Sequence, residues 1–358
     1  MIVTLTPNPS LDRTLQLESL VRGGVNRAAG GRIDPGGKGV NVSRALAAHG
    51  VKNVAVLPLG GPDGAVLADL LVAQGVEVRR VPVVGDTRTN ITVAEPDGTT
   101  TKLNEPGPVL SGAEVADLAA AVLDAVAPGD WVVGCGSVPG GVDDDFYARL
   151  IGPLHARGAR VVVDSSGAAL RAVLPPTPGS STAQPDSAAQ PDSTAQPDST
   201  TYPDLIKPNR EELAEAVGRP LHRLGDVVDA ARELVAAGVG TVLASLGADG
   251  AVLVTADAAL YGSARVDHPR STVGAGDALL AGYLSQVAQL PAAESPGDHR
   301  PVPDTRALAA ALTAALAWGA AATGLPGSRM PAPDDVAAIT VTLHDRIDPQ
   351  RPLEGEPQ

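Results

Sequence analysis

The stretch T-V-G-A-G-D-A-L-L-A-G-Y-L-S-Q-V-A, residues 272–288, decides how the rest of the chain is read. Gly274 and Gly276 can take backbone angles that are closed to other residues, and the apolar residues after them recur at helical spacing. The pattern predicts a glycine turn that opens a helix. Because the first amides of a helix lack internal partners and carry the positive end of its dipole, the amides of Val273 to Gly276 are a candidate anion site.

Asp277 stands in the first turn of this predicted helix. A carboxylate at that place favours the helix dipole, so Asp277 can be read simply as a helix-start acid. The four residues G-A-G-D are weak evidence in a chain with 40 glycines. A functional reading therefore needs support from other parts of the sequence.

Outward from this stretch, short apolar strands alternate with helical patterns. Strands are expected to begin at Ile2, Val54, Val76, Trp131 and Arg160, and helices are expected over about 63–74, 113–126, 143–157 and 226–237. Alternation at this spacing predicts a parallel sheet with helices on both faces. Gly136-Ser137 and Asp164 fall at the ends of two of these strands.

Two hairpins interrupt the alternation. One is expected within 13–33, where apolar and polar residues alternate around Gly23-Gly24, and the other within 87–104, around Pro96-Asp97-Gly98. Both hairpins have polar residues on each face, so neither face is suited to burial in a hydrophobic core. We therefore expect them to form a small β-sheet lid beside the main domain.

Polar residues follow the first strand and the next glycine turn. Asn8 and Asp12 come after the strand at Ile2, either as a ligand-binding edge or as an ordinary polar cap. The segment G-G-K-G-V-N at 36–41 then enters a helix. It is not a Walker A loop, because Gly39 follows Lys38 where Ser or Thr is required. Its glycines indicate either close approach to a polar ligand or only the needs of a turn.

Composition restricts the possible partners. The chain has 358 residues, 44% of them apolar, with 27 basic against 41 acidic residues and a net charge of −14. This charge opposes binding to nucleic acid or to an anionic membrane, so neither partner is expected. Cys135 is the only cysteine, and the start of the chain does not resemble a signal peptide, so a cytoplasmic protein is expected. The apolar run 307–325 is mostly Ala and predicts a buried helix.

Residues 175–203 carry the repeat A-Q-P-D-S, which has no apolar side chain larger than Ala. We expect a disordered surface insertion there. A second Pro-rich loop is expected over 291–303, and a flexible tail over 348–358. The remainder, from 1 to 347, is predicted to form one domain.

Six motifs together resemble the ribokinase-like PfkB sugar kinases, in the order found in that family. They are N-P-S-L-D at 8–12, G-G-K-G-V-N at 36–41, T-K-L-N-E-P-G-P at 101–108, K-P-N-R-E-E at 207–212, S-L-G-A-D-G at 245–250 and V-G-A-G-D at 273–277. The branch that contains 1-phosphofructokinase and tagatose-6-phosphate kinase is the most similar. The resemblance implies a three-layer α/β/α domain with a mostly parallel central sheet and a small β-sheet lid.

The resemblance also implies roles for the nucleotide side of the site. Asp277 matches the catalytic base, and Gly274, Ala275 and Gly276 match the anion hole, groups that phosphoryl transfer requires. Asn209 and Glu212 match a pair that organises Mg²⁺ through water and the nucleotide phosphates. The ATP-binding positions that the resemblance implies are Lys207, Asn209, Ser245, Gly247 and Gly250.

For the sugar, the resemblance implies that Asp12 and Asn41 bind hydroxyls, beside Gly36 and Gly37. The positions implied for the sugar phosphate are Lys38, Arg88, Lys102 and Ser137, with Arg27 serving a neighbouring subunit. Arg88 and Lys102 can also be read as exposed hairpin charges.

The expected activity is transfer of the γ-phosphoryl group of ATP to a sugar phosphate, with fructose 1-phosphate accepting it on the 6-hydroxyl. Two alternatives stay open. One is phosphorylation of tagatose 6-phosphate or fructose 6-phosphate at the 1-hydroxyl, and the other is a sugar-phosphate sensor without turnover. The resemblance further implies Mg²⁺ as cofactor and a homodimer formed through the β lid.

Overall fold

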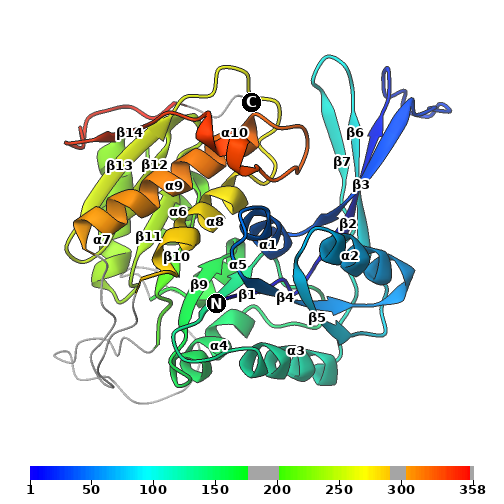
Figure 1. The fold of residues 1–358 in the computed structure, drawn as a ribbon, viewed down its shortest axis with the longest axis horizontal. Coiled ribbons are helices and arrows are strands. Elements are labelled where there is room, and N and C mark those ends of the chain that lie inside the picture. Colours follow the sequence, from blue (N-terminus) through cyan, green and yellow to red (C-terminus); the bar gives the residue numbers. More distant parts are fainter. Residues whose placement is uncertain (176–200, 291–303, 355–358) are drawn as a thin grey trace.

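The structure is a computed structural model that describes residues 1–175, 201–290 and 304–354. Its large sheet has 10 strands. They are β1 (Ile2–Leu5), β4 (Asn53–Leu59), β5 (Glu77–Pro82), β8 (Trp131–Cys135), β9 (Arg160–Asp164), β10 (Leu205–Ile206), β11 (Val242–Ser245), β12 (Ala251–Val254), β13 (Ala259–Ala264) and β14 (Val341–His344). Their order in space is β14-β13-β12-β11-β10-β9-β8-β1-β4-β5 (Figure 1).

Most of this sheet is parallel. Every neighbouring pair from β5 through β1 to β11 runs parallel, as helical crossovers require. The strands β12, β13 and β14 complete one edge in antiparallel pairing. The predicted mostly parallel sheet is confirmed.

Helices cover both faces of the sheet (Figure 1). One face carries α1 (Lys38–Ala48), α2 (Gly61–Ala73), α8 (Ala275–Val287), α9 (Thr305–Thr323) and the short α10 (Pro333–Ala337). The other carries α3 (Gly112–Asp124), α4 (Phe146–His155), α5 (Gly167–Ala172), α6 (Arg210–Val217) and α7 (Leu224–Ala236). Alternate residues of β1 serve the two layers, because Ile2 packs with the α8 and α9 side and Val3 with the α4 side. The three-layer α/β/α architecture is confirmed.

The lid is a separate 4-stranded sheet. Its strands are β2 (Ser10–Gln16), β3 (Gly30–Gly36), β6 (Arg88–Ala94) and β7 (Thr100–Leu103), in the order β3-β2-β6-β7. Each hairpin is antiparallel, and parallel pairing of β2 with β6 joins the two hairpins. The lid is as predicted, except that β2 begins at Ser10, so that Asp12 lies on a lid strand and not in a loop.

Helix α9 is long and apolar enough to cross a membrane by length and composition alone, but half of it is buried inside the protein. Its buried side packs against α8, with Leu308, Leu312 and Leu316 in the same core cluster as Leu280 and Leu284. This agrees with the buried helix predicted from the sequence.

The predicted flexible tail is wrong for residues 348 to 354. The amide of Glu354 donates to Oδ2 of the buried Asp249 at 2.7 Å, and Arg351 lies 3.3 Å from Oδ1 of the same carboxylate. Leu353 packs against the core cluster of α6 and α7. The local composition could not indicate these contacts, because the partner residue stands more than 100 residues earlier in the chain. Most of the predicted insertion (176–200), the second Pro-rich loop (291–303) and the last four residues lie outside the described residues.

Candidate active site

The site lies where the carboxyl ends of the parallel strands meet the first turns of α1 and α8. Asp164 ends β9, Lys207 follows β10, and Ser245 ends β11. Strand β1 has β4 on one side and β8 on the other. The later strands of the sheet are therefore added on opposite sides of β1, which makes this a topological switch point. Open α/β sheets bind ligands at such a switch point.

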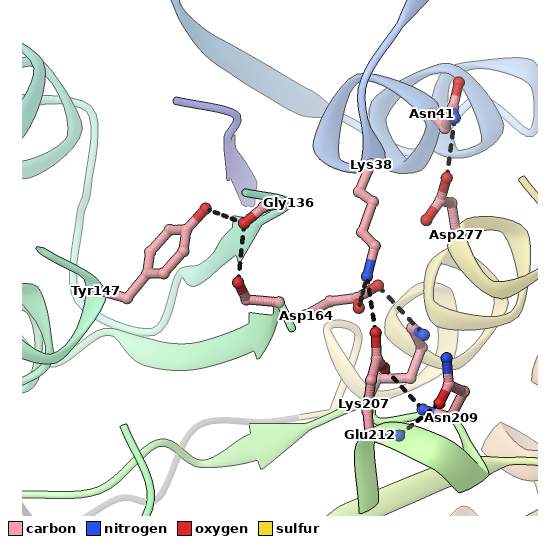
Figure 2. Close-up of polar contacts among 10 residues, drawn as sticks. Lys38, Asn41, Gly136, Tyr147, Asp164, Lys207, Asn209, Glu212 and Asp277 are labelled. Atoms are coloured by element: carbon pink, nitrogen blue, oxygen red, sulfur yellow. Dashed lines mark hydrogen bonds and ion pairs between the residues drawn. The ribbon is translucent and has the colours of Figure 1, made fainter. Parts of the chain in front are cut away.

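Asp277 lies in the first turn of α8 and is 7% exposed. Nδ2 of Asn41, from α1, donates to Oδ2 of this carboxylate at 2.9 Å (Figure 2). Burial and the nearby Asp164 raise the pKa of Asp277 to about 6, against the opposing effects of the Asn41 hydrogen bond and two lysines. The carboxylate is therefore ionised at neutral pH while keeping enough proton affinity to act as a general base.

The start of α8 is shaped by Gly274, the N-cap residue, whose φ of 80° is a left-handed conformation that suits glycine. The first intrahelical bond runs from the amide of Ala278 to the carbonyl of Gly274. The amides of Gly276 and Asp277 therefore have no carbonyl within the helix to bond to. Two of the amides predicted for the anion hole already have partners: the Val273 amide donates to Oγ of Ser271, and the Ala275 amide donates to the carbonyl of Thr272.

A buried carboxylate holds the two lysines of the site. Asp164 is fully buried, with its Oδ1 2.9 Å from Nζ of Lys38 and its Oδ2 3.3 Å from Nζ of Lys207 (Figure 2). Burial alone would raise the pKa of Asp164, but Lys207 and Lys38 outweigh it and keep the pKa below its ordinary value. Burial likewise opposes the charge on Lys38, yet Asp164 and Glu212 hold its pKa above the usual range.

Lys207 reaches from this ion pair to the first turn of α8. A Cβ added at Gly276 would stand 3.3 Å from Nζ of Lys207, so the helix start and the ammonium group are close neighbours. Asp164, which joins Lys207 to Lys38, is a residue to which the sequence assigned no role. Its position at the end of an apolar strand was the available signal.

Asn209 and Glu212 form the N-terminal cap of α6. The Asn209 side chain accepts from the Glu212 amide at 2.7 Å, and Oε2 of Glu212 accepts from the Asn209 amide at 2.9 Å. Oε1 of Glu212 lies 3.7 Å from Nζ of Lys38. The pair is thus both a helix cap and part of the charged site (Figure 2).

The remaining residues predicted for the nucleotide follow β11. Ser245 pairs with Asn209 in a β-bridge, and its amide donates to the carbonyl of Pro208. Gly247 begins the 3-10 turn η1 (Gly247–Asp249) and is exposed. Gly250 closes this turn so tightly against β13 that a Cβ there would stand 2.1 Å from the carbonyl of Gly262, which explains that glycine structurally.

The base of the lid brings Asp12 next to the G-G-K-G turn. Oδ1 of Asp12 accepts from Oγ of Ser10 at 2.7 Å and from Nδ2 of Asn90 at 3.0 Å. Burial raises the pKa of Asp12. A Cβ at Gly36 would lie 2.2 Å from Oδ2 of Asp12, and Gly37 caps α1 with a φ of 119°. Asn90 is a site neighbour that the sequence did not single out.

Arg88 lies at the same end of the lid and is partly buried. Its Nη1 donates to the carbonyl of Glu105 and its Nη2 to the carbonyl of Asn8, both at 3.0 Å, and burial lowers its pKa. Its Nε is buried without a partner, as are Oδ1 of Asn8 and Oδ1 of Asn90. Buried polar atoms without partners are rare in proteins, so this group points to a polar ligand.

Three predicted substrate residues are exposed: Ser137, Lys102 and Arg27. Ser137 follows Gly136, whose carbonyl accepts from the hydroxyl of Tyr147 (Figure 2). The same carbonyl accepts from the hydroxyl of Ser165, and a Cβ at Gly136 would lie 4.0 Å from Cβ of Lys38. Lys102 lies on β7, paired with Thr92, and Arg27 lies in the β2–β3 connection. In the described part of the chain, no hydrogen bond or ion pair joins Lys102 or Arg27 to the residues around Asp277.

Comparison with known proteins agrees with this geometry. The family model described as pfkB family carbohydrate kinase matches residues 6–335. A 1-phosphofructokinase of Rhodobacter capsulatus is 36% identical over 350 residues, covering 96% of each chain. The ATP-dependent 6-phosphofructokinase isozyme 2 of Escherichia coli is 31% identical over 344 residues, covering 96% of this chain and 98% of that protein.

Among solved structures, phosphofructokinase-2 from Escherichia coli in complex with substrates and products superposes with a TM-score of 0.79 at 30% identity. The superposition covers 94% of this chain and 97% of that one. The family model and these relatives each span nearly the whole chain, including both sheets and the residues around Asp277. The protein belongs to the pfkB family of carbohydrate kinases.

Proposed function

We propose that this kinase transfers the γ-phosphoryl group of ATP to the 6-hydroxyl of fructose 1-phosphate, giving fructose 1,6-bisphosphate. The observation that carries the proposal is the buried carboxylate of Asp277, held by Asn41 in the first turn of α8 beside two lysines that Asp164 holds. Phosphoryl transfer needs a group to take the hydroxyl proton and positive charge to stabilise the transferred phosphoryl.

In this proposal each residue has one task. Asp277 accepts the proton of the attacking hydroxyl, and Asn41 holds the carboxylate in place. The amides of Gly276 and Asp277 and the ammonium of Lys207 stabilise the charge on the moving phosphoryl group. Lys38 lies between the buried Asp164 and Glu212, and its ammonium is proposed to contact the phosphate of the sugar substrate.

ATP is proposed to lie along the turn from Ser245 to Gly250, with its phosphates toward α8. Mg²⁺ fits this site through water. Among the described residues no group of three or more His, Cys, Asp or Glu side chains could hold a metal ion. Oε1 of Glu212 is near the site, and Mg²⁺ retains several waters when it binds through few carboxylates. When bound, Mg²⁺ would offset the charge of the phosphates.

The acceptor is proposed to be phosphorylated because Nε of Arg88 is buried without a partner at the base of the lid and can donate to a phosphate oxygen. The unpartnered Oδ1 atoms of Asn8 and Asn90 can only accept, which suits sugar hydroxyls. The curated relative from Rhodobacter capsulatus, named 1-phosphofructokinase, favours fructose 1-phosphate. The relative from Escherichia coli is named a 6-phosphofructokinase, so fructose 6-phosphate stays the second candidate acceptor, together with tagatose 6-phosphate.

A coupled ADP assay tests the proposal with fructose 1-phosphate, fructose 6-phosphate, tagatose 6-phosphate and unphosphorylated fructose. We expect the highest kcat/KM with fructose 1-phosphate. Equal turnover of plain fructose would contradict a phosphorylated acceptor, and sugar-phosphate binding without ADP production would favour the sensor.

The lid is also proposed to form a homodimer, in a cytoplasmic enzyme. Ile33, Arg13, Ile91 and Leu103 are register partners, so they share one lid face, opposite to the face of Asp12 and Asn90. Ile33 is 41% and Leu103 57% exposed. A second lid would bury these apolar side chains and leave the Asp12 face to the substrate.

A further inference from the structure

The amide of Asn41 lies between groups of opposite charge. Its Nδ2 donates to Oδ2 of Asp277 at 2.9 Å, and its Oδ1 accepts from Nη1 of Arg44 at 3.1 Å. Arg44 is on the same helix, three residues later, so the two side chains share one face of α1. Both bonds are buried.

Arg44 is itself fixed by three separate parts of the chain. Its Nη1 also lies 3.1 Å from the carbonyl oxygens of Pro35, at the end of β3, and Ser328, after α9, so its two N–H groups are shared among three acceptors. Its Nε donates to Oε1 of Gln74, just after α2, at 2.8 Å. Arg44 is 7% exposed, and burial lowers the pKa of its guanidinium while Asp34 and Asp12 oppose that effect. These contacts hold the Arg44 guanidinium in one position.

We propose that Arg44 is a positioning residue for phosphoryl transfer: it fixes the orientation of the Asn41 amide so that the NH₂ group faces Asp277. Guanidinium has only donors and an ionised carboxylate has only acceptors. The observed amide orientation satisfies both neighbours, and the reversed one would satisfy neither. This inference rests on the proposed function, in which Asp277 is the base.

Asp277 is sensitive to this orientation. The groups that act on its charge are Asp164 from β9, Lys207 after β10, and Lys38 and Asn41 from α1. Of these, Asn41 supplies the hydrogen bond, which lowers the pKa of the carboxylate. A turned amide would place Oδ1 against the carboxylate, move the carboxylate and raise its pKa. In this proposal Arg44 acts on turnover through Asn41.

A double-mutant cycle with Arg44→Lys, Asn41→Ala and the double variant tests the proposal, with kcat and both KM values measured. Lysine keeps the charge but lacks the planar fork that spans these acceptors. We expect Arg44→Lys to lower kcat by roughly 10- to 100-fold, the effect of misplacing a catalytic group by about 1 Å. In the Asn41→Ala background the same change should alter kcat by less than about twofold, because the amide is already gone.

The pH profile provides a readout that a purely structural role would not move. The acidic limb of kcat/KM should shift to higher pH in Arg44→Lys. Arg79→Lys is the matched control, since Arg79 donates to the carbonyl of Ala121 away from the site and its loss should change neither kcat nor the limb. If Arg44→Lys does not fold, Gln74→Leu removes the Nε partner and should give a smaller effect of the same kind.

Equal loss of kcat from Arg44→Lys in both backgrounds, or unchanged kcat in the folded variant, would overturn the proposal. Asp277→Asn separates this failure from failure of the proposed function. If Asp277→Asn keeps its turnover, the base assignment is wrong. If Asp277→Asn is inactive and the cycle is additive, only the role of Arg44 is wrong.

Discussion

Asp277 is the residue on which the proposed chemistry depends most directly. Replacing it with Asn keeps the shape of the side chain but removes the site that takes the hydroxyl proton. We expect kcat to fall by roughly 10²- to 10⁴-fold, while KM for ATP changes little. Steady-state kinetics on the folded variant, checked by circular dichroism, measures this.

The alternative reading of Asp277 as a helix-start acid makes a different prediction. It gives Asp277→Asn a stability loss of about 0.3–1 kcal/mol and nearly intact turnover. Retained kcat in a folded variant would therefore exclude the catalytic reading.

The pKa of Asp277 predicts the pH dependence. Because the ionised form is the active one, kcat/KM should fall as pH decreases through about 6. The phosphate of the substrate also titrates near pH 6. Asn41→Ala separates the two effects, because loss of the hydrogen bond raises the pKa of Asp277 and leaves that of the substrate unchanged. If the acidic limb of kcat/KM stays at the same pH in Asn41→Ala, the limb reports titration of the substrate phosphate and not of Asp277.

The sequence motifs singled out individual site residues. They did not single out residues that hold other site residues in place. Asp277, Lys38, Asn41 and Lys207 stand in separate motifs and lie close together in the structure. Asp164 was not assigned because Lys38 lies 126 residues away. Arg44 was not assigned because its contact with Asn41, three residues earlier, gains meaning only with partners such as Ser328, which lies 284 residues away. Neither spacing forms a local pattern.

Among the elements, the lid carries the residues proposed for the sugar phosphate. Arg88→Lys should raise KM for the sugar phosphate by roughly 10- to 100-fold, the equivalent of a charge-assisted hydrogen bond of about 1.5–3 kcal/mol. KM for ATP should stay the same, because Arg88 lies on the lid. A parallel rise in both KM values, with a lower melting temperature, would instead indicate damage to the contacts with Glu105 and Asn8.

The start of α6 tests whether Asn209 is only a cap. Serine caps helices about as well as asparagine, so Asn209→Ser should leave the melting temperature nearly unchanged. If Asn209 also organises the nucleotide and Mg²⁺, KM for Mg-ATP should rise in the same variant. Unchanged KM for Mg-ATP in Asn209→Ser would mean that Asn209 serves only as the cap of α6. Asn209→Ala is the control in which the cap is lost and the protein is destabilised.

Periodicity and glycine turns were enough to predict the alternating strands and helices and both hairpins. They did not reveal that β2 begins at Ser10, where it pairs both with Gly36 of its own hairpin and with Arg88 of β6, almost 80 residues later. They also gave the wrong result for residues 348–354, which are held by Asp249 and by the α6 and α7 cluster. Elements fixed by distant partners escape local patterns.

For the molecule as a whole, the proposed dimer can be tested by light scattering after size exclusion. Leu103→Glu places a charge on the exposed apolar face of the lid and should convert the dimer to a monomer. Val84→Glu, at a position 95% exposed and outside the lid strands, is the matched control and should remain dimeric. A wild-type protein that is already monomeric would contradict the proposal.

The charges around Asp164 have a consequence for proton exchange with the solvent. Lys38 and Lys207 face the carboxylates of Asp164, Glu212 and Asp277, so negative side chains outnumber positive ones at the site. An arriving triphosphate adds negative charge beside a carboxylate whose pKa is already about 6, and like charge raises it further. Nucleotide binding without a divalent cation should therefore draw protons from solution, so that the heat of binding varies with the ionisation enthalpy of the buffer. The affinity of this enzyme for its nucleotide is, by the same linkage, a function of pH.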